Sequence, residues 1–199
     1  MGTKIYLIRH GETEGADTRR YKGHIDVPLS ENGISQVQRL SEHLSRNAEL
    51  SAVYTSDLSR ASRSAEIIAA PFNITPIVIR ELKERNFGDW EGMSFDEIQK
   101  IYPDAFTSWA KNPLRFSPLN GESTLEVHDR VMPVFIRIEE ENKGKNIAIV
   151  THGGVTRVIL CSMLEMPLEN IFRIEQDFAA LNIVEFWDYP VVKQINFVV

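Results

Sequence analysis

Short apolar runs alternate along this chain with longer segments in which apolar residues recur every three or four positions. Four of the runs are of strand type and lie at residues 3–9, 52–56, 76–79 and 146–151. The run at 3–9 is continuous rather than alternating, which is typical of a strand that is buried on both faces. Because amphipathic segments separate the four runs, the pattern predicts an α/β fold with a mainly parallel sheet and helices on both faces.

The first two helices are predicted from an apolar face and a capping residue. One helix is expected from about Ile34, with Val37 and Leu40 on its apolar face. Asp57 is expected to cap a second helix that runs to about Ala70 and ends before a proline.

Two capping boxes of the form Ser-x-x-Glu mark later helix starts. Ser94–Glu97 opens a short helix, and Ser123–Glu126 opens the longest helix of the chain, which ends near Asn142. Two further helices are expected at 104–111 and 155–164.

The last part of the chain predicts a hairpin at an edge of the sheet. Residues 179–187 and 191–198 are of strand type, and Tyr189-Pro190 makes the turn between them. An exposed sheet edge can pair with a second copy of the chain, so a homodimer is one expectation.

Composition narrows the class of protein. The chain has 199 residues with no repeat or linker, which predicts a single domain over 1–199. No apolar run reaches membrane-spanning length, so no membrane association is expected. The only cysteine is Cys161, which excludes an internal disulfide and, together with the absence of an apolar leader, favours a cytoplasmic location.

Charge narrows the class of ligand. The net charge is −6, which argues against nucleic acid as a partner. Arginines nevertheless cluster at Arg9, Arg19 and Arg20 and again at Arg60 and Arg63. A small anionic ligand fits this distribution better than a long polyanion.

Two of the predicted parallel strands end in the same kind of residue. Arg9-His10 follows the first strand, and His152 follows the strand at 146–151. The carboxyl ends of parallel strands meet at one edge of a sheet, where α/β proteins bind their ligands. Arg60, in the first turn of the helix after Asp57, is expected at the same edge, where the start of a helix favours an anion.

These residue types suit phosphoryl transfer. A neutral imidazole at His10 can attack phosphorus and form a phosphohistidine. Arg9, Arg60 and His152 can stabilise the charge on the phosphoryl oxygens. A carboxylic acid must then protonate the leaving alcohol, and Glu84 is the best candidate because it lies in a long loop at 80–93, after the third strand.

Each of these residues has an ordinary explanation when it is taken alone. An Arg-His pair after a strand is usually structural, Arg60 could be a surface residue, and Glu84 belongs to a charged run. The prediction depends on all of them coinciding at one sheet edge. No spacing of His, Cys and Asp residues suggests a metal site, so neither a metal nor a cofactor is expected.

Taken together, the motifs resemble the signature of the histidine phosphatase superfamily, also called the phosphoglycerate mutase-like family. The similarity begins at Arg9-His10-Gly11-Glu12-Thr13 and continues in family order over nearly the whole chain. Its other parts are Gly23–Gly33, Tyr54–Ala61, Glu84–Gly92, Gly121-Glu122-Ser123 and Thr151-His152-Gly153-Gly154-Val155.

The resemblance implies a three-layer α/β/α sandwich in which His10 is the phosphorylated nucleophile and Glu84 the proton donor. It implies that Arg9, Arg60 and His152 bind the phosphoryl group without a metal or cofactor. Lys22, Gly23 and Gly153 complete the expected phosphate-binding set. The chain departs from the family pattern at Ala16 and Lys22, where an asparagine and a threonine or glutamine are usual, and we expect Lys22 to supply the contact that Ala16 cannot.

Within the family, the short middle region and Gly153-Gly154-Val155 resemble the small phosphatases rather than the mutases. A hydrolase for a small phosphate ester is therefore expected, with α-ribazole 5'-phosphate and phosphoserine as candidate substrates. A cofactor-dependent phosphoglycerate mutase is the main alternative, and a phosphate-binding module without catalysis is a third. Specificity is expected from residues 14–28 and 84–122, with the following candidates: Arg20, Trp109, Arg115 and Phe116.

Overall fold

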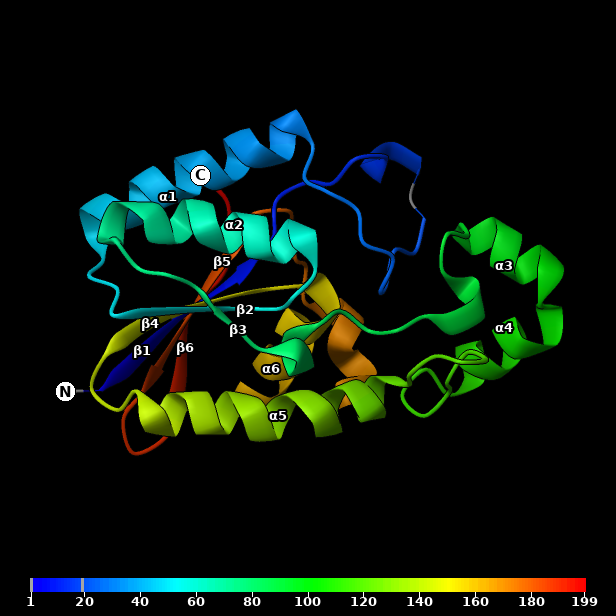
Figure 1. Ribbon diagram of the computed structural model, residues 1–199. Coiled ribbons are helices and arrows are strands. Elements are labelled where there is room, and N and C mark those ends of the chain that lie inside the picture. The colour runs from blue at the N-terminus through cyan, green and yellow to red at the C-terminus, as the bar shows by residue number, and fades with distance from the viewer. Residues whose placement is uncertain (1, 19) are drawn as a thin grey trace.

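The computed structural model describes residues 2–18 and 20–199 and has a six-stranded sheet at its centre (Figure 1). The strand order is β3-β2-β4-β1-β5-β6. The strands are β1 (Thr3–Arg9), β2 (Ala52–Thr55), β3 (Ile77–Val78), β4 (Asn146–Thr151), β5 (Leu181–Phe186) and β6 (Pro190–Phe197). The first four are mutually parallel, whereas β5 is antiparallel to both of its neighbours. The expected α/β sandwich is confirmed, with a mixed sheet.

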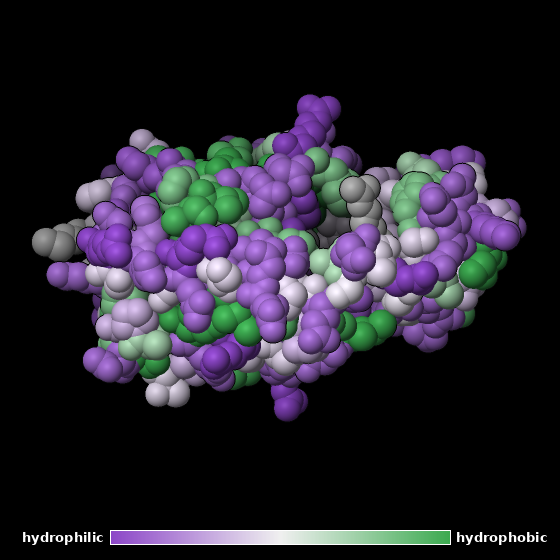
Figure 2. Space-filling view, turned by 90° about the horizontal axis from the view of Figure 1, so that it is seen from above, coloured by the Kyte–Doolittle hydropathy of each residue, from purple (hydrophilic) through white to green (hydrophobic). Residues whose placement is uncertain are grey.

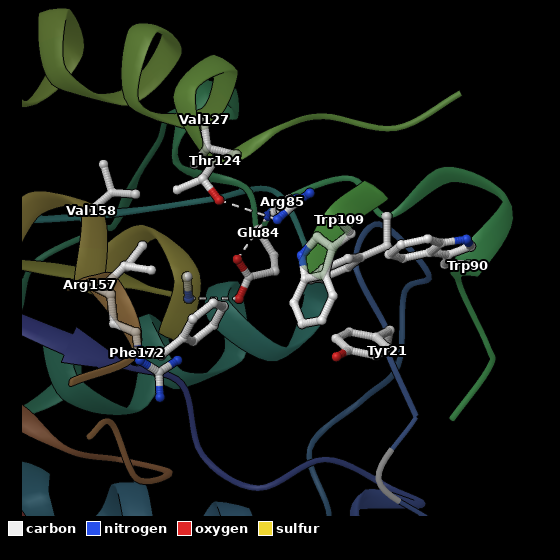
Figure 3. A pocket seen from close by; sticks show the side chains of 13 residues that line it. Tyr21, Glu84, Arg85, Trp90, Trp109, Thr124, Val127, Arg157, Val158 and Phe172 are labelled. Carbon is white, nitrogen blue, oxygen red and sulfur yellow. Dashed lines mark hydrogen bonds between the residues drawn. The ribbon is translucent and has the colours of Figure 1, made fainter. Parts of the chain in front are cut away.

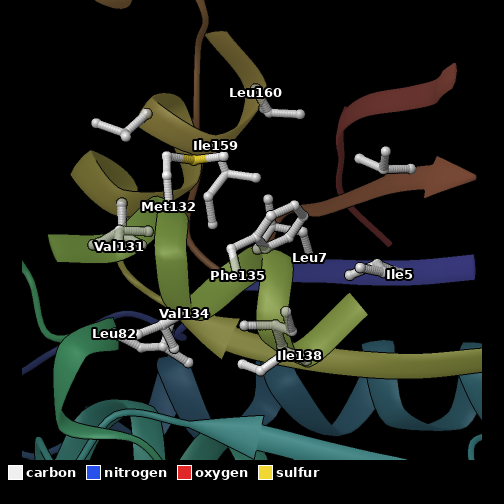
Figure 4. Packing of buried hydrophobic residues seen from close by; sticks show 14 of the residues in the cluster. Ile5, Leu7, Leu82, Val131, Met132, Val134, Phe135, Ile138, Ile159 and Leu160 are labelled. Atoms are coloured by element: carbon white, nitrogen blue, oxygen red, sulfur yellow. The ribbon is translucent and has the colours of Figure 1, made fainter. Parts of the chain in front are cut away.

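Helices cover both faces of the sheet (Figure 1). The long ones are α1 (Glu31–Asn47), α2 (Ser59–Ala69), α5 (Thr124–Glu141) and α6 (Gly153–Met163). Alternate side chains of β1 point to opposite faces of the sheet, and each face packs against a different pair of helices. Ile5 and Leu7 pack into a core with α5 and α6 (Figure 4), and Tyr6 and Ile8 pack into a second core with α1 and α2. Both faces of the strand are buried, as its continuous apolar run predicts.

A separate helical segment extends from the sheet body at the carboxyl ends of the parallel strands (Figure 1). It contains α3 (Phe95–Ile101) and α4 (Pro103–Lys111), with the short 3₁₀ helices η3 (Arg80–Leu82) and η4 (Gly88–Trp90) before it. Both predicted capping boxes, at the starts of α3 and α5, are present. Figure 2 shows a hollow between this segment and the sheet body.

Three predicted helix starts are wrong. Helix α6 begins at Gly153 rather than at residue 155, because the chain turns into the helix directly after His152, which is the N-cap residue. Helix α1 begins at Glu31 rather than near Ile34, because the Ser30 hydroxyl accepts a hydrogen bond from the Gly33 N–H at 3.0 Å. Asp57 does not cap α2. Its carboxylate pairs with Lys83 at 3.1 Å, and the Ser59 N–H donates instead to Asp26 at 2.8 Å.

The predicted terminal hairpin is confirmed, since β5 and β6 are antiparallel and β6 forms one edge of the sheet. Pairing of two copies through this edge stays a prediction. Among the described residues, no helix combines the length and the apolar character needed to cross a bilayer.

Candidate active site

The carboxyl ends of β1 and β4 bring two histidines together. Arg9 pairs with Thr151 in the parallel ladder, so the residues that follow each of them, His10 and His152, lie side by side. The His10 N–H donates to the Thr151 carbonyl at 2.9 Å, and the two imidazole centroids are 5.1 Å apart in an edge-to-face arrangement. The sheet register therefore creates this pair, as the sequence predicts.

The imidazole of His10 is held with one nitrogen free. Its Nδ1 lies 2.7 Å from the Gly11 carbonyl, which can only accept, so Nδ1 carries the hydrogen and Nε2 keeps a lone pair. Burial, together with the positive charges of Arg9 and Arg60, holds the pKa of His10 well below its usual value. The ring is therefore neutral at physiological pH, which is the state that a nucleophile requires.

Arg9 is fixed below the cavity by an aromatic ring and a carbonyl. Its guanidinium lies 4.0 Å from the centroid of Phe178, and its Nη1 donates to the Gln176 carbonyl at 2.5 Å. Burial lowers the pKa of Arg9 to about 10, so the group is still charged at neutral pH. Its Nε is buried without a partner among the described residues, which leaves a donor for an anion.

Arg60 is the second residue of α2 and only 2% exposed. It donates to the carbonyls of Gly23 at 2.7 Å and Ile25 at 2.9 Å, so the same guanidinium that carries positive charge to the site also fixes the loop at 11–32. Gly23 has a φ of +51°, and a Cβ there would overlap the Glu91 carboxylate, so this position requires glycine.

His152 is fully buried behind His10. Its Nε2 is 2.8 Å from the Ser56 hydroxyl, while its Nδ1 has no partner among the described residues. Burial is the main reason that the pKa of His152 is well below its usual value, and the neighbouring His10 and Arg60 lower it further.

Glu84 lies between η3 and η4, and both of its carboxylate oxygens are held by backbone donors. Oε1 accepts from the Arg85 N–H at 2.8 Å, and Oε2 accepts from the Gly154 N–H at 3.0 Å. Gly154 is the second residue of α6, where N–H groups have no partner within the helix. Helix α6 thus fixes a carboxyl group that comes from another part of the chain.

Seven of the eight predicted site residues line one cavity, and the eighth, His152, is the buried residue behind it. The seven are Arg9, His10, Lys22, Gly23, Arg60, Glu84 and Gly153. Ala16, the departure from the family pattern, lines the same cavity as Lys22. Arg19 lies outside the described residues.

Several residues of this cavity were not predicted as site residues, among them Arg157 and Phe178. Arg157 lies one helical turn after Gly153, and this i, i+4 spacing on the helix after His152 is a signal that could have identified it. Phe178, which lies under Arg9, comes from an irregular segment without any periodicity, so nothing in the sequence indicates its position.

The four specificity candidates have different positions. Arg20 lines the phosphate cavity but is held by Glu97 at 2.6 Å. Trp109 lines an adjoining chamber. Phe116 stacks on Trp90 with centroids 5.3 Å apart and lines neither space, and Arg115 is exposed outside both.

The donor set of the site is cationic rather than metal-binding. Across residues 2–18 and 20–199, no three His, Cys, Asp or Glu side chains are grouped so that they could hold a metal ion. The arrangement combines a neutral imidazole, two buried guanidinium groups and one carboxyl group, which together can bind and transfer a phosphoryl group.

Comparison with known proteins agrees with this chemistry. The sequence model of the histidine phosphatase superfamily (branch 1) matches residues 5–196. Phosphoglycerate mutase-like protein 4 of Arabidopsis thaliana is 40% identical over 156 residues, covering 77% of this chain and 68% of that protein. An adenosylcobalamin/alpha-ribazole phosphatase of Salmonella typhimurium is 31% identical over 196 residues, covering 97% and 96%.

A solved structure has the same architecture. It is a putative alpha-ribazole-5'-P phosphatase from Escherichia coli, with a TM-score of 0.91 and 27% identity, covering 99% of this chain and 97% of that one.

Proposed function

Because this chain belongs to the histidine phosphatase superfamily and is a phosphatase, we propose that it hydrolyses small phosphate monoesters through a phosphohistidine on His10. The observation that carries the proposal is the Nδ1–carbonyl hydrogen bond of His10, which leaves Nε2 free beside two buried arginines. A site that only binds phosphate would not need an imidazole held in the tautomer that leaves Nε2 without a hydrogen.

In the first step, Nε2 of His10 attacks phosphorus and the bond from phosphorus to the ester oxygen breaks. Glu84 gives its proton to the departing alcohol oxygen. Arg9, Arg60 and His152 stabilise the phosphoryl oxygens as charge spreads over them.

In the second step, a water molecule attacks the phosphohistidine and gives its proton to Glu84. The bond from phosphorus to nitrogen breaks, which releases inorganic phosphate and restores neutral His10. Lys22, Gly23 and Gly153 line the same cavity, which supports their proposed part in binding the phosphate.

The test is a His10→Ala variant assayed with p-nitrophenyl phosphate and with trapping of the phosphoenzyme. We expect a loss of at least about 1,000-fold in kcat, together with loss of an acid-labile phosphoryl group. His128→Ala is the matched control, because His128 lies on α5 away from the cavity and contacts Asp129. Retention of full activity by His10→Ala would overturn the proposal.

The role of Glu84 has its own test. Glu84→Gln keeps the shape of the side chain but removes its proton. The value of kcat/KM, which reports formation of the phosphohistidine and not its hydrolysis, should therefore fall more for alkyl esters than for p-nitrophenyl phosphate, whose leaving group departs without a proton. An equal loss for both kinds of ester would argue against Glu84 as the proton donor.

The same substrate panel separates the alternatives. Rapid interconversion of 2- and 3-phosphoglycerate with slow hydrolysis would favour a mutase, and binding without turnover of any ester would favour a module without catalysis. Within the phosphatase proposal, α-ribazole 5'-phosphate and phosphoserine are the named candidate substrates, and comparison of their kcat/KM values tests each.

A further inference from the structure

A second chamber opens beside the phosphate cavity. The two share five residues, among them Glu84 and Arg157. Figure 3 shows the rings of Trp109 and Phe172 on either side of the Glu84 carboxyl group. The chamber therefore adjoins the carboxyl group next to which a leaving alcohol would lie.

The walls of the chamber are apolar and come from separate parts of the fold. Trp109 belongs to α4, Trp90 to η4, and Val158 to α6. Phe172 comes from η5 (Leu168–Arg173), and although it borders the chamber, 64% of its surface is exposed. An exposed aromatic ring at the rim of an apolar space gains free energy when a flat apolar ligand covers it.

Two of the polar side chains of the chamber, Arg85 and Glu84, already contact other groups of the protein. Arg85 uses Nε, Nη1 and Nη2 on the Glu122 carbonyl at 2.6 Å, the Thr124 hydroxyl at 3.3 Å and the Phe116 carbonyl at 3.1 Å. Both oxygens of Glu84 accept backbone N–H groups. These contacts use part of the hydrogen-bonding capacity of Arg85 and Glu84, and the apolar walls supply most of the surface on which an alcohol can lie.

The positive charges near the chamber disfavour an ammonium group on the alcohol. Arg85, Arg157 and Arg9 are cations, and Glu84 is the only carboxylate that lines either space among the described residues. The ammonium group of serine would lie near these guanidinium groups and compete for the one carboxyl group that the reaction needs.

We propose that the chamber between Trp109 and Phe172 binds the alcohol part of the substrate and selects phosphate esters of flat aromatic or extended apolar alcohols over esters of small zwitterionic alcohols such as serine. The inference depends on the proposed phosphatase function and names its substrate class. Burial of one phenyl ring should raise kcat/KM by about 10- to 100-fold.

The test compares three esters of primary alcohols, so that differences in leaving-group acidity stay small. They are 3-phenylpropyl phosphate, propyl phosphate and O-phosphoserine. The expected order of kcat/KM is phenylpropyl first, propyl second and phosphoserine last.

Trp109→Ala and Phe172→Ala should each lower the ratio of phenylpropyl to propyl kcat/KM by about 5-fold or more. Trp187→Ala is the matched control, since this tryptophan is 65% exposed, lies between β5 and β6 and borders neither space, so the ratio should not change. Because the Phe172 side chain is largely exposed, Phe172→Ala should leave the fold intact. A change in the ratio for this variant therefore reports on the chamber and not on unfolding.

A binding measurement separates this inference from the proposed function. Calorimetry with 3-phenylpropylphosphonate and propylphosphonate, which cannot be hydrolysed, should show a Kd about 10-fold or more lower for the phenyl compound. If hydrolysis by phosphohistidine fails but this difference persists, the proposed function is wrong and the chamber is supported. Equal Kd values, or a preference for phosphoserine, would overturn the assignment of the chamber.

Discussion

The carboxyl group of Glu84 lies directly against the backbone of Gly154. The Gly154 N–H donates to one carboxylate oxygen at 3.0 Å, and a Cβ on Gly154 would overlap the other oxygen. The glycine thus supplies both a donor and the space in which the carboxyl group lies. The position of the proposed acid therefore depends on a missing side chain on another element.

Gly154→Ala should lower kcat for alkyl phosphates by about 10-fold or more, because the added methyl group displaces the carboxyl group from the leaving oxygen. Steady-state kinetics of the variant measures this effect.

The double variant with Glu84→Gln provides the control. If the alanine acts through Glu84, the double variant should be no slower than Glu84→Gln alone. Additive losses would show that Gly154 acts in another way.

Arg130 of α5 holds the segment that carries Glu84. It donates to the Glu81 carbonyl at 2.5 Å and to the Lys83 carbonyl at 3.0 Å, and it pairs with Glu122 at 2.8 Å. Arg130→Met should lower the free energy of unfolding by about 2 kcal/mol and also lower kcat, because charged hydrogen bonds are lost and the loop loosens.

Denaturant titration and kinetics of Arg130→Met measure the two effects. Arg137→Met is the comparison, since Arg137 is on the same helix but exposed. If Arg130→Met and Arg137→Met change the free energy of unfolding and kcat by the same amounts, the contacts of Arg130 with the loop do not support the position of Glu84.

Acid should destabilise the fold through the two buried histidines. The folded-state pKa values of His10 and His152 are both lowered, mainly by burial. The unfolded chain therefore binds more protons below about pH 6.5, so stability is greatest above that pH and falls as the pH decreases, by up to about 1.4 kcal/mol per pH unit for each histidine.

Urea unfolding of the wild type and of His10→Asn at about pH 8 and about pH 5.5 measures this contribution, and the variant should have a smaller pH dependence. An identical dependence would contradict a neutral, buried His10.

Metal chelation should leave turnover unchanged, because the arginines supply the positive charge that a metal supplies in other phosphatases. Assays with EDTA, beside a metal-dependent phosphatase treated in the same way, test this.

Vanadate should inhibit, because it can take the trigonal bipyramidal geometry of phosphorus in the transition state at His10.

Much of the candidate site could be predicted from sequence, because parallel strands place their carboxyl ends at one edge of the sheet. Arg9, His10 and His152 follow from that rule alone, and Arg60 follows from its place at the start of a helix. Gly23 could be named as a site residue, but not the carboxylate of Glu91 that requires it to be glycine.

Contacts between irregular segments could not be predicted in this way. Asp57 has the right residue type for a cap, yet Asp26, from a loop far earlier in the chain, accepts the Ser59 N–H instead. Phe178 under Arg9 and Phe172 at the chamber rim are likewise placed by tertiary packing, for which local sequence carries no periodic signal.

The place of β1 in the sheet has a consequence for synthesis. Lys4 pairs with Asn146, and Ile5 with Val184, so β1 is synthesised long before either of its partner strands. Contacts of such long sequence separation form late, and an apolar strand that waits for them is prone to aggregate. Nascent chains therefore carry an unpaired β1 until β4 and β5 have been translated.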